Sequence, residues 1–147
     1  MDNLTLRPAR EADFSAIRIL VRSTNINPTG LKWPRFIVAE TPDGQMIACG
    51  QIKPHIDGST EIASIAVQPE YRKRGLARAI IEELTHDAPR PLYLMCRSEL
   101  GPLYEKFGFY AVQSDEMPPY FRRISKLASL VDLLAREGTT LLIMRCD

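Results

Sequence analysis

The stretch that decides the fold spans residues 67–77 and reads Val67-Gln68-Pro69-Glu70-Tyr71-Arg72-Lys73-Arg74-Gly75-Leu76-Ala77. A strand-like apolar run, residues 61–67, precedes it, and an amphipathic helical pattern follows to residue 86. The first turn of a helix carries unpaired backbone N–H groups and a partial positive charge, which together bind phosphate groups. A basic, glycine-containing turn at this place therefore predicts an anion site. A solvated basic turn without a ligand is an equally good interpretation of composition alone.

Two common phosphate-binding motifs do not fit. GxxxxGK[S/T] and GxGxxG need more than one glycine, and Gly75 is the lone glycine of the stretch. A nucleic-acid patch is also disfavoured, because no aromatic platform is interleaved with the basic residues to stack bases.

Composition predicts one soluble domain over residues 1–147. The formal net charge of +1 argues against binding nucleic acid or a membrane surface by bulk charge. No apolar run reaches the roughly 18 residues of a membrane span, and the N-terminus does not resemble a signal peptide. Three scattered cysteines and two histidines offer no metal-ligand spacing, so we expect no metal site and a cytoplasmic location.

Outward from the deciding stretch, periodicity and turn residues divide the chain into strands and helices. Hairpin-connected strands come first, and strands that alternate with helices follow, which predicts a mixed α/β sheet with helices on its faces. The predicted strands are residues 4–7, 36–40, 46–54, 61–67, 92–96, 109–113 and 141–145, and the predicted helices are 11–22, 75–86, 100–107 and 120–136, the last closed by Gly138. The last helix places Phe121, Ile124, Leu127, Ala128, Val131 and Leu134 on one stripe.

Three motifs in order resemble the GNAT N-acetyltransferase superfamily. Arg72-x-x-Gly75-x-Ala77 is similar to its Q/R-x-x-G-x-G/A signature, which binds the pyrophosphate of acetyl-CoA, and Ala66-Val67-Gln68-Pro69 is similar to the strand end before it. Leu6-Arg7-Pro8-Ala9 with Ala12-Asp13-Phe14 resembles the family's first strand and helix. Leu103-Tyr104-Glu105-Lys106-Phe107-Gly108-Phe109 resembles its Y-x-x-x-G-F motif. The resemblance covers residues 4–112.

The resemblance implies a mostly antiparallel sheet splayed between strands four and five, with the pantetheine arm of acetyl-CoA between them. Backbone groups of Ile65, Ala66 and Val67 would bond to that arm. The amides of residues 72–77 would receive the diphosphate, with charge from the basic side chains there. The implied cofactor-binding set is Ile65, Ala66, Val67, Arg72, Lys73, Arg74, Gly75, Leu76, Ala77, Arg78, Ser98 and Tyr104, with Lys73 or Arg74 reaching the 3′-phosphate.

Two residues are candidate catalysts by the same resemblance. Tyr104 matches the tyrosine that protonates the departing thiolate, and a phenol is a suitable acid at neutral pH. Glu61 resembles the glutamate that deprotonates the amine, and strand alternation places it on one face with Ala63, Ile65 and Val67. The structural alternatives are a tyrosine packed on Phe107 and Phe109, and a surface charge on an edge strand.

The chain also departs from the family pattern. Ser98 and Gly101 stand where many relatives have N-x-x-A, so Ser98 would bond to the cofactor from a less suitable position. Residues 117–138 insert a helix before the last strand; this helix either walls the acceptor site, packs outside the sheet or forms a dimer contact. Residues 27–33 follow the first helix, where Trp33 either lines the acceptor site or fills the core.

We therefore expect an N-acetyltransferase that moves an acetyl group from acetyl-CoA to a primary amine by direct attack. A covalent cysteine intermediate is disfavoured, because Cys49 and Cys96 lie in apolar strands without a base. The alternative is a non-catalytic acyl-CoA-binding or sensing module. The sequence does not distinguish a small amine, an amino acid or a peptide as the acceptor.

Overall fold

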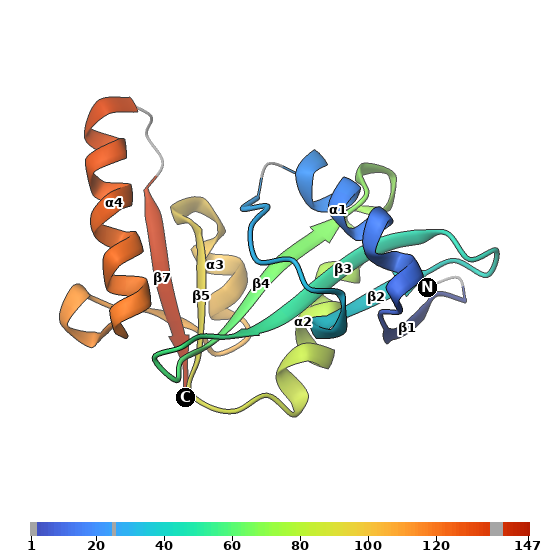
Figure 1. The fold of residues 1–147 in the computed structure, drawn as a ribbon, viewed down its shortest axis with the longest axis horizontal. Helices are drawn as coiled ribbons and strands as arrows, with labels where there is room; N and C mark the ends of the chain where they lie inside the picture. The colour runs from blue at the N-terminus through green and yellow to red at the C-terminus, as the bar shows by residue number, and fades with distance from the viewer. Residues whose placement is uncertain (1–2, 25, 136–139) are drawn as a thin grey trace. The chain divides into compact units, whose positions relative to one another are not determined.

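The computed structural model describes residues 3–24, 26–135 and 140–147 (Figure 1). Arg136 and Gly138, at the predicted end of the last helix, lie outside the described residues. The α-helices are α1 (Phe14–Ser23), α2 (Leu76–His86), α3 (Gly101–Glu105) and α4 (Pro119–Ala135). The strands are β1 (Thr5–Pro8), β2 (Phe36–Glu40), β3 (Met46–Pro54), β4 (Thr60–Val67), β5 (Leu92–Arg97), β6 (Tyr110–Ala111) and β7 (Leu141–Cys146).

The strands form a seven-stranded sheet in the order β1-β2-β3-β4-β5-β7-β6. The pairs β1–β2, β2–β3, β5–β7 and β6–β7 are antiparallel, whereas β4 pairs with β5 in parallel. That parallel pairing covers only Thr60 with Leu92 and Glu61 with Tyr93, although the two strands are eight and six residues long. The predicted mixed, mostly antiparallel sheet with a splay between strands four and five is confirmed.

The chain divides into two compact units, which are described separately. The first comprises Met1–Lys53 and Ile62–Ala88, and the second Pro54–Glu61 and Pro89–Asp147. The prediction of one domain over residues 1–147 stays a prediction.

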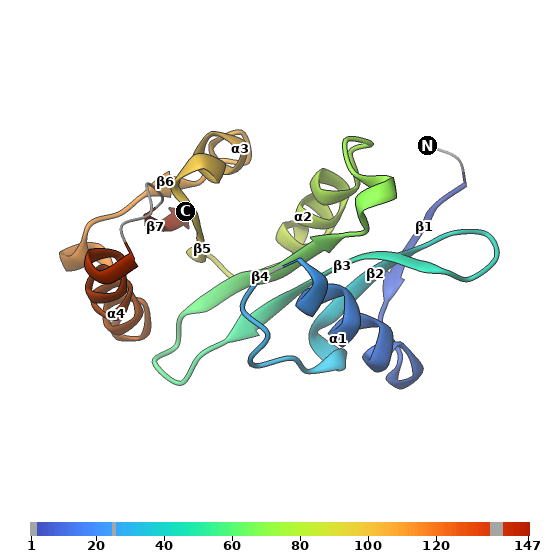
Figure 2. The same ribbon diagram turned by 90° about the horizontal axis from the view of Figure 1, so that it is seen from above.

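In the first unit, α1 and α2 cover opposite faces of the sheet (Figure 2). The buried faces of the two helices are apolar and consist of Ile17, Leu20 and Val21 of α1 and Leu76, Ile80, Ile81 and Leu84 of α2. Gly50 permits close packing on the α2 face, because a Cβ there would lie 2.6 Å from side-chain atoms of Ile65 and Ile80. Trp33 packs against the α1-side core cluster, which supports its core-filling role.

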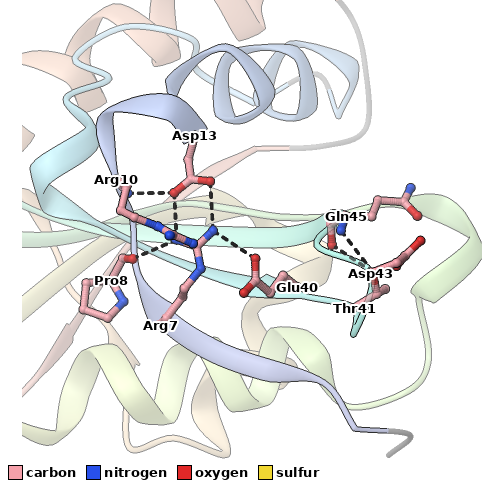
Figure 3. Close-up of polar contacts among 8 residues, drawn as sticks. All are labelled: Arg7, Pro8, Arg10, Asp13, Glu40, Thr41, Asp43 and Gln45. Atoms are coloured by element: carbon pink, nitrogen blue, oxygen red, sulfur yellow. Dashed lines mark hydrogen bonds and ion pairs between the residues drawn. The ribbon is translucent and has the colours of Figure 1, made fainter.

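An ion-pair network fixes β1 to β2 and to the turn before α1 (Figure 3). The Arg7 guanidinium donates to both carboxylate oxygens of Asp13, at 2.8 and 3.0 Å, and to Glu40 at 3.0 Å. These bonds hold the pKa of the Asp13 carboxyl below its ordinary value of 3.8, although partial burial opposes the shift. The network thus joins Arg7 and Asp13, which both lie in the family-like start of the chain.

In the second unit, α3 and α4 lie on opposite sides of β5 and β7 (Figure 2). Phe121 of α4 is fully buried in a cluster with Tyr93, Val112, Met117 and Ile143. The start of α4 therefore packs on the sheet. The predicted stripe of α4 is wrong at Leu127, which is 63% exposed. The strand predicted over residues 109–113 is shorter, with regular pairing only at Tyr110–Ala111.

Candidate functional site

The loop between β4 and α2 has the backbone of an anion site. Lys73 and Gly75 both adopt left-handed conformations, with φ of 63° and 81°, and Gly75 is the N-cap of α2. Turns of this kind form anion-binding concavities from successive amides. Ala79 is the first residue of α2 whose amide donates to the turn, to the Gly75 carbonyl at 3.0 Å. Among the described residues, the amides of residues 73–77 donate no hydrogen bond to a backbone carbonyl in a turn or loop. They are therefore available to an anion.

The basic side chains of this loop differ in what they contact. Arg72 donates to the Val67 carbonyl at 3.2 Å and thereby closes the loop. Arg74 lies over the ring of Tyr71, 5.2 Å from its centroid, and Arg78 forms an exposed ion pair with Glu82 at 2.9 Å. Lys73 is exposed and has no ion-pair partner among the described residues. Of the basic side chains predicted to bind phosphate, Lys73 is therefore the most available, whereas the Arg72 guanidinium is engaged with the Val67 carbonyl.

The strand that leads into the loop is interrupted at Ser64. Its φ is 59°, a left-handed value that non-glycine residues adopt at a conformational cost. The side-chain alternation predicted from Glu61 through Val67 is therefore broken: Glu61 and its neighbour Ile62 are both buried, and Ala63, Ser64 and Ile65 are all half-buried. Residues 65–67, predicted to bond to the pantetheine arm, follow directly after this irregularity.

Glu61 is not a surface charge. Its side chain is 2% exposed, and Oε1 lies 2.8 Å from Nε2 of His55. The hairpin turn at residues 55–59 produces this contact, because the His55 amide donates to the Ser59 carbonyl and diagonal neighbours in a hairpin lie within reach. The contact with the His55 ring holds the carboxylate in one position, as the role of a general base requires. His55 is not among the residues predicted from the sequence, although it flanks the Asp57-Gly58 turn, a hairpin signal that would place it near Glu61.

The start of α4 holds this histidine in place. The Tyr120 ring stacks on His55, with centroids 3.8 Å apart, and Phe121 meets the same ring edge-on at 5.7 Å. Asp57, in the hairpin turn, accepts a hydrogen bond from the Tyr120 amide at 3.0 Å. Burial and then the charge of Glu61 raise the pKa of Tyr120. The inserted helix is therefore connected to the candidate base through His55.

Tyr104 lies in α3 of the second unit and is half-buried. Its ring meets Phe109 edge-on at 6.3 Å, as the packing alternative predicts. Its hydroxyl has no hydrogen-bond partner among the residues that the structure describes. Burial, and to a lesser extent Cys96, raises its pKa to about 12, so the phenol is protonated at neutral pH. Packing and an acid role are thus compatible at this position.

Ser98 has a structural role that the sequence analysis did not foresee. Its amide donates to the Thr140 carbonyl at 2.8 Å, and its hydroxyl accepts from the Thr140 amide at 3.3 Å, which fixes the start of β7. The same hydroxyl donates to Glu99 at 3.4 Å. A hydroxyl engaged in this way is poorly placed to bind a cofactor.

The cysteines do not have the environment of nucleophiles. Burial raises the pKa of Cys49 to about 12 and that of Cys96, with a contribution from Glu99, to about 11. A reactive cysteine needs a lowered pKa. The three free cysteines are all buried, which agrees with the prediction that no cysteine acts as the nucleophile.

The described residues contain no group of three or more His, Cys, Asp or Glu side chains arranged to hold a metal ion. Among the described helices, none has both the length and the apolarity needed to cross a membrane.

The family profile for the acetyltransferase (GNAT) domain matches residues 32–111, which include the phosphate loop, Glu61 and Tyr104. The chain belongs to the GNAT acetyltransferase family. A search of curated proteins gave no significant match to the chain. The family assignment therefore rests on the profile, and the solved structures bear on the fold.

Several solved structures share the fold of this GNAT domain. N-acetylglutamate synthase from Neisseria gonorrhoeae, complexed with coenzyme A and N-acetyl-glutamate, has a TM-score of 0.71 at 20% identity; the match covers 98% of this chain but 35% of that one. Rv2747 from Mycobacterium tuberculosis, in a complex with CoA, has a TM-score of 0.70 at 23% identity over 95% and 97% of the two chains. Escherichia coli ElaA has a TM-score of 0.66 at 17% identity and full coverage of both chains. The chain thus spans about a third of the synthase but nearly all of the other two.

Proposed function

We propose that this protein is an acetyl-CoA-dependent N-acetyltransferase that acts on a primary amine by direct attack. The observation that carries the proposal is the loop of residues 72–77, where two left-handed residues and the start of α2 present amides to an anion. Family membership supports coenzyme A as the source of that anion. The solved relatives from Neisseria gonorrhoeae and Mycobacterium tuberculosis were both captured with CoA.

In the proposed cofactor site, the amides of residues 73–77 bind the diphosphate, because the Arg72 amide already donates to the Pro69 carbonyl at 3.3 Å, and Lys73 or Arg74 contacts the 3′-phosphate. Backbone groups of Ile65, Ala66 and Val67 bond to the pantetheine arm. Arg78 adds positive charge near the first turn of α2. Ser98 contributes little, because its hydroxyl already bonds to Thr140 and Glu99.

The proposed reaction uses two side chains. The amine nitrogen attacks the thioester carbonyl carbon and loses a proton to the Glu61 carboxylate, which His55 orients at 2.8 Å. Amides near Val67 polarise the carbonyl. The C–S bond then breaks, and the Tyr104 phenol gives its proton to the thiolate, so the products are the acetylated amine and free CoA. Exchange of protons with solvent restores both side chains.

The rival proposal is a non-catalytic acyl-CoA-binding module. Release of CoA thiol, measured with acetyl-CoA and a panel of amines, separates the two, alongside calorimetric measurement of acetyl-CoA affinity. Turnover with any amine, reduced in Glu61→Gln without loss of acetyl-CoA affinity, supports the enzyme. Tight binding without thiol release across the panel supports the binding module.

A further inference from the structure

The first unit contains a buried cation that the proposed chemistry does not use. Lys53, near the end of β3, is 6% exposed. Its ammonium donates to the carbonyl of Thr29 at 3.3 Å, and no described carboxylate forms an ion pair with it. An ammonium has three donors, and burying one without an anion is costly. Among the described residues, no negative charge therefore balances the charge of the buried Lys53 ammonium.

A second buried polar side chain, that of Gln51, is only partly satisfied by hydrogen bonds. Gln51 lies two residues before Lys53 on the same face of β3 and is 0% exposed. Its amide nitrogen donates to Ser64 Oγ at 2.8 Å and to the Gly30 carbonyl at 3.4 Å, which fixes the orientation of the amide group. Among the residues that the structure describes, the amide oxygen has no hydrogen-bond partner. This oxygen can accept a hydrogen bond from an ammonium group.

The loop over these two side chains is fitted closely to Lys53. Gly30 has a φ of 68°, and a Cβ there would lie 2.8 Å from both Cε and Nζ of Lys53. The loop belongs to residues 27–33, which follow the first helix and for which the sequence left open a place at the acceptor site or in the core. Gln51 also contacts Ser64, the residue before the segment proposed to hold the pantetheine arm. Gln51 thus lies next to the backbone at which the acetyl donor is proposed to bind.

We propose that Lys53 and Gln51 form the recognition site for the α-carboxylate and α-amino group of a free amino acid, and that this amino acid is the acetyl acceptor. The proposal rests on the proposed N-acetyltransferase function. Lys53 Nζ binds the carboxylate, and Gln51 Oε1 accepts a hydrogen bond from the amino group before it is deprotonated. Amines that lack the carboxylate leave the Lys53 ammonium unpaired and are poor acceptors.

The test compares L-phenylalanine, L-tyrosine, L-leucine, L-histidine and L-lysine with the amines formed by removing their carboxylates. Thiol release gives kcat/KM for each pair, and calorimetry on the CoA-saturated protein measures binding of each compound without turnover. In the wild type, we expect the best amino acid to exceed its amine by at least about 30-fold, the range for truncating one partner of a buried charge pair. The exposed Lys32, in the same loop, supplies the control Lys32→Met, which should keep that ratio.

Two variants separate the charge of Lys53 from a structural role. Lys53→Met removes charge and donor, whereas Lys53→Gln removes the charge but keeps a donor for the Thr29 carbonyl. Both variants should bring the amino acid-to-amine ratio, in turnover or binding, close to one. A ratio near one in the wild type, or a wild-type ratio in Lys53→Gln, overturns the proposal, as does a failure of every amino acid to bind. Lys53-dependent binding without thiol release supports the carboxylate site and refutes the transferase.

Discussion

Replacing Phe121 by alanine is expected to lower the free energy of unfolding by about 3–5 kcal/mol, the range for a fully buried aromatic residue. The side chain is 0% exposed. Its ring stacks on Tyr93 with centroids 5.2 Å apart, and such an aromatic pair contributes about 0.5–1.5 kcal/mol beyond the burial of area. The loss is therefore a large share of the roughly 5–15 kcal/mol by which proteins are stable.

Thermal unfolding followed by calorimetry measures this loss. For a chain of this size, about 2–4 °C is lost per kcal/mol, so Phe121→Ala should melt about 6–20 °C lower. Leu127→Ala is the matched control on the same helix, because Leu127 is 63% exposed and its loss should cost within about 0.5 kcal/mol. Equal melting temperatures for the two variants would refute the packing of α4 on β5 and β7. A dimer contact through the outer face of α4 predicts the opposite order, in which Leu127→Ala is the more damaging.

Three further predictions concern the acid, the loop and the N-terminal network. Tyr104→Phe should lower kcat by about 10²-fold or more at neutral pH, since the pKa of about 12 keeps the wild-type phenol protonated and able to act as the acid. Turnover assays measure this loss and calorimetry should show little change in acetyl-CoA affinity; full activity would remove Tyr104 from the acid role. Gly75→Ala should weaken acetyl-CoA binding by straining the backbone at a φ of 81°, because no atom of a non-neighbouring described residue lies within 4 Å of the added Cβ. Gly44→Ala, with a φ of 86° and equally open space, should leave the acetyl-CoA affinity intact. The free energy of unfolding of the wild type should fall as pH drops below 3.8, because Asp13 has a lowered pKa in the folded state and the unfolded chain takes up the proton first. Denaturant titrations at several pH values should show a smaller loss in Arg7→Met, and an equal loss would contradict the role of Arg7.

Much of the fold follows from local patterns in the sequence. The strands Phe36–Glu40 and Met46–Pro54 have the predicted bounds, because turn residues mark their ends. The buried faces of α1 and α2 follow from helical periodicity. Periodicity failed at Leu127, which lies on the predicted stripe of α4 and is nevertheless 63% exposed. It also failed in β4, where a left-handed Ser64 breaks the alternation that a regular strand would keep.

The candidate site was predictable only where a motif carried it. The phosphate loop and Tyr104 came from motif resemblance, and the structure gives each a suitable environment. The partner of Glu61 depends on hairpin register and on the docking of α4, so His55 and Tyr120 did not emerge from the sequence. Lys53 and Gln51 appear as ordinary polar residues in the sequence, and only their burial reveals them. Ser98 shows the reverse case, because a tertiary contact with Thr140 occupies a hydroxyl expected to bind the cofactor.

The most direct test of the central claim is a single-turnover experiment with acetyl-labelled acetyl-CoA, followed by mass spectrometry of both the amine and the protein. Direct attack predicts that the label appears on the amine in an amount equal to the CoA released, that no acetylated protein forms, and that Glu61→Gln slows the transfer. Label on a cysteine before the amine is added would contradict direct attack. Label that stays entirely on bound acetyl-CoA, with every amine tested, would contradict the transferase itself.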